Sequence, residues 1–135
     1  MTSIIWKESF SLGIEAIDSQ HKVLLSYIND LHEAQKNSAS QIIIRDVIEK
    51  LHDYTVFHFD MEEKMQLGCN YDKYEIHKEE HQWFIDKLKE LDKDLGKNNL
   101  LLSLKTVSFL KDWTINHILG SDKEFGEYLK IKEGV

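Results

Sequence analysis

The stretch HKEEHQWFIDKLKELDKDL, residues 77–95, decides the fold of this chain. Two histidines and four large apolar residues recur in it at spacings of three and four, so they share one face of a helix. Charged residues fill most of the remaining positions, as is typical of a face that meets water. We therefore expect a helix from about Tyr71 to Leu95, ended by Gly96. The residues of its inner face are His77, His81, Phe84, Leu88, Leu91 and Leu95.

A helix of the same kind follows an N-terminal arm of roughly residues 1–17. The segment IDSQHKVLLSYINDLHEA, residues 17–34, has Asp18 as a candidate N-cap, because a side-chain oxygen there can accept a hydrogen bond from a free amide of the first turn. Its inner face again combines a histidine with large apolar side chains. These residues are Ile17, His21, Leu24, Ile28 and Leu31.

Two more helices complete the periodic pattern. One opens at SASQ, where Ser38 and Gln41 fit the capping-box pattern, and Gly68 is its expected stop. The other runs from about Asn98 to Leu119. Since the connections between these helices are short, neighbouring helices should be antiparallel.

The composition supports an all-α protein. The chain has 135 residues, no proline and six glycines, so little in it would punctuate many short strands. We expect residues 1–135 to form a single domain, an up-down-up-down four-helix bundle with an N-terminal arm and a short C-terminal helix.

Charge and patterning exclude several classes of function. The formal net charge of −7 argues against a nucleic-acid partner, which requires a basic surface. The start, MTSIIWKESF, lacks a signal-peptide pattern, and no stretch approaches the roughly 20 apolar residues of a membrane span. The single Cys69 excludes a disulfide framework within the chain. The expected setting is a soluble cytoplasmic protein without a membrane partner.

Polar residues interrupt the apolar faces of all four expected helices, and in an up-down bundle their positions coincide at one end of the core. One buried histidine is usually explained by a hydrogen bond to its neighbours. Five histidines and a carboxylate in one layer would each need a partner, and a metal centre satisfies all of them together. The residues are His21, His58, Glu62, His77, His81 and His117.

The pentapeptide HKEEH, residues 77–81, also fits the H-x-x-E-H motif of a zinc protease, with Glu80 as its general base. That interpretation uses only two of the core histidines and leaves the others without a role. A solvated helix surface is a further alternative, but His77 and His81 continue the apolar face instead of opposing it. Both alternatives explain less than a metal centre built from the whole layer.

Asp122 can join this layer only if its helix is irregular. It follows His117 by five residues, which on an ideal α-helix turns it roughly 140° away from the histidine. Gly120 can end the helix in a left-handed conformation, with Ser121 and Glu124 as the capping box of a new helix, and a π-bulge would serve equally well. The alternative is that Asp122 is a surface carboxylate in the first turn of the C-terminal helix.

Five imidazoles and two carboxylates are too many ligands for one metal ion. If two ions each take about six ligands, and if the carboxylates and one oxygen atom bridge them, a single coordination position stays open. Such a site binds one small molecule. Because neutral imidazoles dominate, it favours reversible binding over deep oxidation of the metal.

Four motifs together resemble the bacterial hemerythrins, and the match runs through nearly the whole chain: a histidine after IDSQ, then HFDMEE, HKEEH and HILGSD. The resemblance implies reversible binding of dioxygen at two non-haem iron ions joined by a bridging oxo or hydroxo group. By position, His77, His81 and His117 would hold the iron without a vacancy. His21 and His58 would hold the iron with the open position. Glu62 and Asp122 would bridge the pair.

The resemblance also predicts an apolar pocket around the open position. Leu24 and Leu25, one turn after His21, and Trp113, one turn before His117, are candidate walls that can equally be ordinary core residues. Thr114 departs from the family, which commonly has leucine there. Its hydroxyl can donate to the bound ligand, admit water, or only bond back to a helix carbonyl.

Other functions of such a site stay open. The leading expectation is oxygen carriage, storage or delivery, with an unidentified oxygen-accepting protein as a possible partner. The alternatives are an enzyme that acts on nitric oxide or peroxide or repairs iron clusters, and an oxygen or redox sensor. Repair proteins of related fold tend to bridge their metals with two glutamates, so Asp122 counts against that role.

Overall fold

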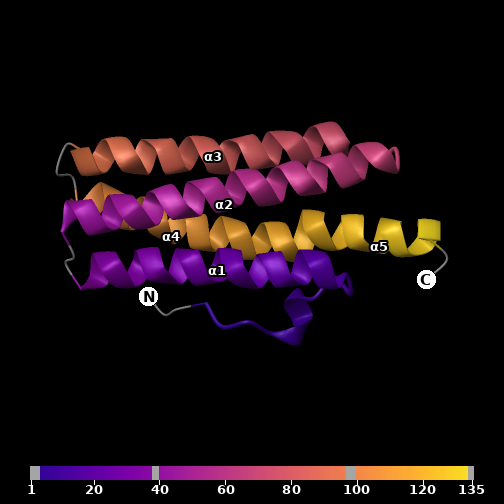
Figure 1. Cartoon of the computed structure of the whole chain (residues 1–135), viewed down its shortest axis with the longest axis horizontal. Coiled ribbons are helices and arrows are strands. Elements are labelled where there is room, and N and C mark those ends of the chain that lie inside the picture. The colour runs from indigo at the N-terminus through magenta and orange to yellow at the C-terminus, as the bar shows by residue number, and fades with distance from the viewer. Residues whose placement is uncertain (1–3, 38–39, 97–99, 134–135) are drawn as a thin grey trace.

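The computed structural model describes residues 4–37, 40–96 and 100–133, and within them the chain is all-helical. Four long helices lie alongside one another in alternating directions (Figure 1). Helix α1 packs against α2 and α4, and α3 packs against α2 and α4, which closes the bundle. The predicted four-helix bundle is therefore confirmed. Its helices are α1 (Glu15–Lys36), α2 (Gln41–Gly68), α3 (Tyr74–Gly96) and α4 (Leu100–His117).

The N-terminal arm runs along α1 and contains one short 3₁₀ turn, η1 (Glu8–Phe10). The prediction that Asp18 caps α1 is wrong, because the helix begins earlier, at Glu15, with Ile14 as its N-cap. The Asp18 carboxylate instead accepts hydrogen bonds from the Ser11 hydroxyl at 2.5 Å and the Leu12 amide at 2.8 Å. It therefore fixes the arm to the helix, a contact that local helix signals do not report.

The ends of the middle helices follow the sequence signals with small shifts. Ser40 caps α2 by accepting a hydrogen bond from the Ile43 amide at 3.3 Å, while the candidate cap Ser38 lies outside the described residues. Helix α2 ends at Gly68 as predicted, but the left-handed residue of the following turn is Asn70, with φ of 56°.

The beginning of α3 comes three residues later than expected, and the helix ends at the predicted Gly96. The predicted start of the next helix at Asn98 lies outside the described residues, as does the side chain of Leu95.

The last helix of the bundle continues without a break into the C-terminal helix. A π-helical segment, η2 (Ile118–Asp122), joins α4 directly to α5 (Lys123–Glu133). Of the two irregularities that the sequence allowed, the π-bulge is therefore confirmed. The left-handed Gly120 and the Ser121 capping box are wrong, since Gly120 has no positive φ and the Ser121 hydroxyl donates to Glu80 instead.

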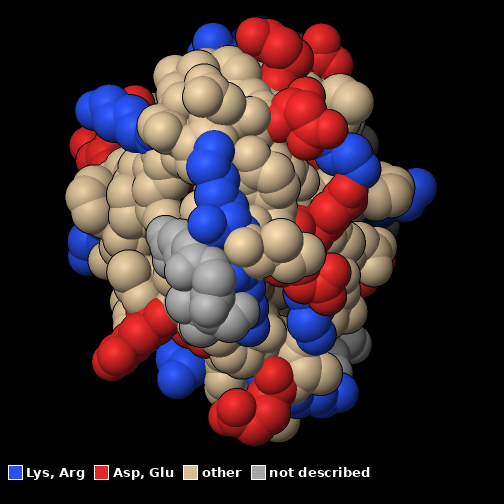
Figure 2. All heavy atoms as spheres, turned by 90° about the vertical axis from the view of Figure 1, so that its right-hand side faces the viewer, with Lys and Arg blue, Asp and Glu red and all other residues tan. Residues whose placement is uncertain are grey.

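The core is mainly apolar, and most of its buried histidines and carboxylates gather in one layer, while His32, Gln35 and Lys111 are buried elsewhere. Large side chains such as Leu31, Leu51, Phe84 and Leu110 are fully buried. Toward the end that carries α5, Lys, Arg, Asp and Glu side chains of both signs are interspersed over the surface (Figure 2). Within the described residues, no helix combines the length and the apolar character that crossing a bilayer requires.

Candidate metal centre

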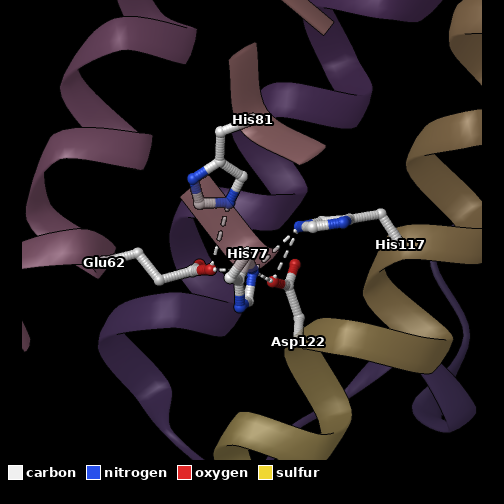
Figure 3. Close-up of side chains that lie close together, drawn as sticks. All are labelled: Glu62, His77, His81, His117 and Asp122. Carbon is white, nitrogen blue, oxygen red and sulfur yellow. Dashed lines mark hydrogen bonds and ion pairs between the residues drawn. The ribbon is translucent and has the colours of Figure 1, made fainter. Parts of the chain in front are cut away.

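All seven predicted site residues are buried, and they come together in one layer of the core. Helix α1 contributes one histidine, α2 a histidine and a glutamate, α3 two histidines, α4 the last histidine and η2 the aspartate. Figure 3 shows five of them, Glu62, His77, His81, His117 and Asp122, with their polar atoms pointing toward a common centre. The structure therefore brings together every residue that the sequence placed in this layer.

The π segment brings Asp122 into the layer. In a π-helix residues five apart are hydrogen-bonded neighbours, so the five-residue step from His117 to Asp122 returns to the same face. Asp122 is only 1% exposed, which rules out the surface alternative. Its Oδ1 lies 3.1 Å from Nε2 of His117.

Each carboxylate divides its two oxygens between two groups of imidazoles. Glu62 Oε1 lies 2.8 Å from Nε2 of His77 and 3.4 Å from Nε2 of His81, whereas its Oε2 lies 3.2 Å from Nε2 of His58.

Asp122 behaves in the same way, with Oδ1 2.8 Å from Nε2 of His77 and Oδ2 3.0 Å from Nε2 of His21. This is the arrangement expected of carboxylates that bridge two metal ions.

Two overlapping groups of ligand atoms result, each with its atoms within 4.8 Å of one another. The larger group, here called the five-ligand set, is Glu62, His77, His81, His117 and Asp122. The smaller, here called the four-ligand set, is His21, His58, Glu62 and Asp122.

The chemistry of these atoms fits a metal better than it fits hydrogen bonding. Both Glu62 oxygens and the Nε2 atoms of His21 and His81 are buried and lie at ion-pair distance from one another or from neighbouring groups of the layer, yet among the described residues they make no hydrogen bond of good geometry. The Nε2 atoms of His77 and His117 lie 3.0 Å apart. Unpaired burial of such groups is unfavourable by about 1–3 kcal/mol each, and metal ions at the centre would coordinate them all.

A second layer of polar residues lies behind the imidazoles. The Nδ1 atom of His58 donates to Gln20 Oε1 at 2.7 Å, and Nδ1 of His81 donates to Glu63 Oε2 at 3.0 Å. A proton on Nδ1 leaves the lone pair on Nε2, so these two rings are held in the tautomer that binds metal.

The remaining imidazoles differ in what lies behind them. The Gln66 amide lies 2.7 Å from Nδ1 of His77, and when that nitrogen carries a proton the amide accepts it through its oxygen after a half-turn. Nδ1 of His117 lies 3.5 Å from Glu80 Oε2, while Nδ1 of His21 has no hydrogen-bond partner among the described residues. Glu80, the general base of the rejected protease interpretation, therefore belongs behind His117.

The pKa values reflect the close packing of acids and imidazoles. Burial alone would raise the pKa of Glu62 and of Asp122, but the surrounding histidines outweigh it and lower both pKa values below their usual range. Burial opposes charge on the imidazoles too, yet the two carboxylates raise the pKa of His77 to about 9 and that of His117 to about 10. His77 and His117 are therefore in the charged imidazolium form at neutral pH. A metal ion that binds them would displace the extra proton of each ring.

The predicted pocket residues lie close to this layer. Leu24, Leu25 and Thr114 are buried, and Trp113 is partly buried with its ring stacked on His117 at 4.4 Å between ring centroids. The Thr114 hydroxyl donates to the Leu110 carbonyl at 2.7 Å, so its proton is directed along the helix and only its lone pairs face the surroundings. That these residues form the walls of an oxygen pocket stays a prediction.

The outer residues Gln20, Glu63 and Gln66 were not predicted from the sequence. Phe59, whose ring stacks on His81 at 3.8 Å with an angle of 2° between the planes, was not predicted either. Glu63 and Phe59 lie inside the motif HFDMEE and Gln20 inside IDSQH, so the motifs did contain a signal.

Known proteins resemble this chain over most of its length. The family model described as Hemerythrin HHE cation binding domain matches residues 12–129. Bacteriohemerythrin of Clostridium acetobutylicum is 35% identical, covering 90% of this chain and 97% of the relative. Bacteriohemerythrin of Stenotrophomonas maltophilia is 31% identical, covering 96% of this chain and 84% of the relative. A crystal structure of wild-type hemerythrin aligns with a TM-score of 0.83 at 28% identity, covering 93% of this chain and 97% of that one.

Proposed function

This chain belongs to the hemerythrin family of di-iron, oxygen-binding domains, and from this premise we propose that it carries, stores or delivers dioxygen by binding it reversibly. The family match spans residues 12–129, and we propose that residues 1–135 form one such domain. A cytoplasmic location and a separate oxygen-accepting protein complete the proposal. Neither nucleic acid nor a membrane is a proposed partner.

The proposed ligands divide as the two sets do. His77, His81 and His117 hold one iron, and His21 and His58 hold the other. Glu62 and Asp122 bridge the two ions, since each directs one oxygen at each group of imidazoles. An oxo or hydroxo group supplies the remaining bridge.

The proposal depends mainly on one observation: the two ligand sets differ in their number of histidines. The five-ligand set has three histidines where the four-ligand set has two, while both share the same carboxylates. With one further bridging atom, only the ion on the His21 and His58 side keeps an open position. One open position at a pair of metal ions is what binding of a single small molecule requires.

In this function the protein holds the metal ions, orients their histidine ligands and excludes water from the site. When the protein holds a pair of ferrous ions, the pair would supply the electrons and the open position for dioxygen. Gln20 and Glu63 fix the tautomers of His58 and His81, and buried apolar residues such as Leu24 and Leu25 keep water away from the site. A dry, preoriented site of this kind favours release of the ligand over irreversible oxidation of the metal.

An optical titration tests the proposal. The protein is reconstituted with ferrous iron without oxygen, and its visible spectrum is recorded before oxygen, after oxygen and after purging. A band that appears with oxygen and disappears on purging is expected. His21→Leu should abolish the band because it removes a ligand of the open ion, whereas His52→Ala, at an exposed position, should leave it unchanged.

An irreversible change to a ferric spectrum would contradict carriage. It would favour the alternatives of an enzyme acting on nitric oxide or peroxide, an iron-cluster repair protein, or a sensor. Failure of the protein to take up two iron ions would contradict the ligand assignment itself.

A further inference from the structure

A row of stacked rings leads from the surface of the bundle to one of the proposed iron ligands. The Trp113 ring lies 4.4 Å from the His117 imidazole, with 10° between the planes. The Trp83 ring, on α3, lies 5.8 Å from the Trp113 ring, on α4, with 17° between the planes. Trp83 is 39% exposed, so the row begins in contact with solvent.

Stacking of this kind matters for electron transfer. The rate of electron tunnelling falls steeply with the distance between donor and acceptor orbitals, and aromatic rings that lie close together shorten the gaps that the electron must cross. Phe84, with its ring centroid 4.9 Å from that of Trp113, packs beside the row within the core. Two ring-to-ring steps connect the exposed ring of Trp83 to the imidazole of His117.

A second row of rings provides an internal comparison. Tyr128, Tyr71 and Phe125 lead toward His77, but successive rings are tilted by 53° and 51°. The last step, from Phe125 to His77, spans 6.4 Å at 90°. The ring planes are more tilted at every step of this row, although its first two centroid distances, 4.9 Å each, are shorter than the 5.8 Å between Trp83 and Trp113. The second row therefore serves as the control for parallel stacking.

We propose that Trp83 and Trp113 form the entry route by which an external one-electron donor reduces the diferric centre. This inference rests on the proposed function, because a carrier that loses its electrons by autoxidation no longer binds dioxygen. Each passage oxidises the donor by one electron and reduces one ferric ion to ferrous, so two passages restore the pair. No bond forms or breaks in the indole rings.

The route ends at a residue of the five-ligand set. His117 belongs to the five-ligand set, whereas the open position belongs to the four-ligand set. Glu62 and Asp122 join the two sets and can pass the second electron between the ions. A donor can contact Trp83 at the surface, where the ammonium of Lys87 lies 5.5 Å from the ring.

Anaerobic stopped-flow reduction tests the route. The diferric protein is mixed with reduced methyl viologen, a one-electron donor, and loss of the ferric absorption is followed. Trp83→Leu should slow reduction severalfold, and Trp83→Phe, which keeps a ring, should slow it less. Tyr128→Leu in the second row and Phe109→Leu, at a ring that is 61% exposed on α4, should leave the rate unchanged.

Two further measurements distinguish a loss of the electron route from a change in the iron pair or in the fold. The midpoint potential of the iron pair should be the same in Trp83→Leu and wild type, since the variant changes coupling and not driving force. In the metal-free protein, Trp83→Leu should remove the ultraviolet circular dichroism signal of the stacked indole pair and leave the helix signal unchanged, which checks the stacking without iron.

An unchanged or faster reduction of Trp83→Leu, or equal slowing by Tyr128→Leu, would overturn the inference. Reversible oxygen binding is measured in the same preparations. If the wild-type protein does not release oxygen, the proposed function is wrong. If oxygen binding is reversible but wild type and all variants are reduced at the same rate, only the proposed route is wrong.

Discussion

Gln66 illustrates how a single side chain outside the metal-facing layer can control it. It is fully buried, and its amide contacts the outer nitrogen of His77. Gln66→Leu would leave that nitrogen without a partner and free the ring to rotate. Loss of such an outer contact typically weakens metal binding about 10- to 100-fold.

The measurement for Gln66→Leu is competition for metal against a chelator of known affinity. Gln82→Leu is the matched control, because Gln82 is exposed and donates only to Asp86. Equal metal affinity in wild type and Gln66→Leu would show that the amide does not support His77.

Thr114 carries a prediction about oxidation. Its hydroxyl proton is engaged by the Leu110 carbonyl, so the oxygen presents lone pairs that can hold a water molecule next to the site. Thr114→Val preserves the shape and removes that acceptor. Autoxidation of the oxygen adduct should slow, while the free energy of unfolding changes by no more than about 1 kcal/mol.

The decay of the oxygen-dependent absorption band measures this effect. Thr106→Val, on the same helix, is the control. An autoxidation rate in Thr114→Val equal to that of wild type would mean that the hydroxyl is only a helix-bonded core group.

At the scale of the elements, the π segment is the feature that completes the site. It inserts one extra residue into the path from α4 to α5 and returns Asp122 to the inner face. Gly120 within it is exposed, and a Cβ added there would meet nothing within 4 Å. The glycine is therefore not required by the backbone or by packing.

Gly120→Ala should stabilise the metal-free protein by about 0.5–1 kcal/mol, because alanine loses less backbone entropy than glycine in a helix. Gly13→Ala should destabilise it, since Gly13 has a φ of +75° and the Lys130 side chain occupies the space of a Cβ. Denaturant unfolding of both variants gives the two free energies. Destabilisation by Gly120→Ala would mean that the segment needs glycine, as a left-handed helix end would.

The sequence predicted the helices better than it predicted their ends and the contacts between segments. Periodicity fixed the four helices and the inward histidines because burial of one face dominates helix packing. Asp18 was misassigned because its partners, Ser11 and Leu12, belong to an arm without periodicity. The contact of Gln20 with His58 likewise joins different helices, and no local spacing encodes it.

At the scale of the whole molecule, the metal layer is an electrostatic balance between acids and imidazoles. In the metal-free protein the pKa of His77 is raised to about 9 and that of His117 to about 10, so both are protonated at pH 7. The lowered pKa values of Glu62 and Asp122 keep both carboxylates charged there. Metal binding must therefore release protons from the histidines and not from the acids.

We expect about two protons to be released on metal loading at pH 7, and the apparent metal affinity to rise as pH increases toward 9. The sign follows because deprotonation, which metal binding requires, becomes easier as the pH approaches the raised pKa values. Calorimetric titration with Co²⁺ in buffers of different ionisation enthalpy counts the protons. Release of none would contradict the protonated state of the metal-free site.

The N-terminal arm fastens the beginning of the chain to its end. Lys123 donates to the Ser9 carbonyl at 2.8 Å, and Gly126 in α5 leaves room for Leu12, which a side chain there would contact at 3.1 Å. Both contacts lie just after the π segment that presents Asp122. We therefore expect residues that do not contact the metal to influence how long it stays bound: weakening the contact of Lys123 or of Leu12 should shorten metal retention more than it lowers the melting temperature of the bundle.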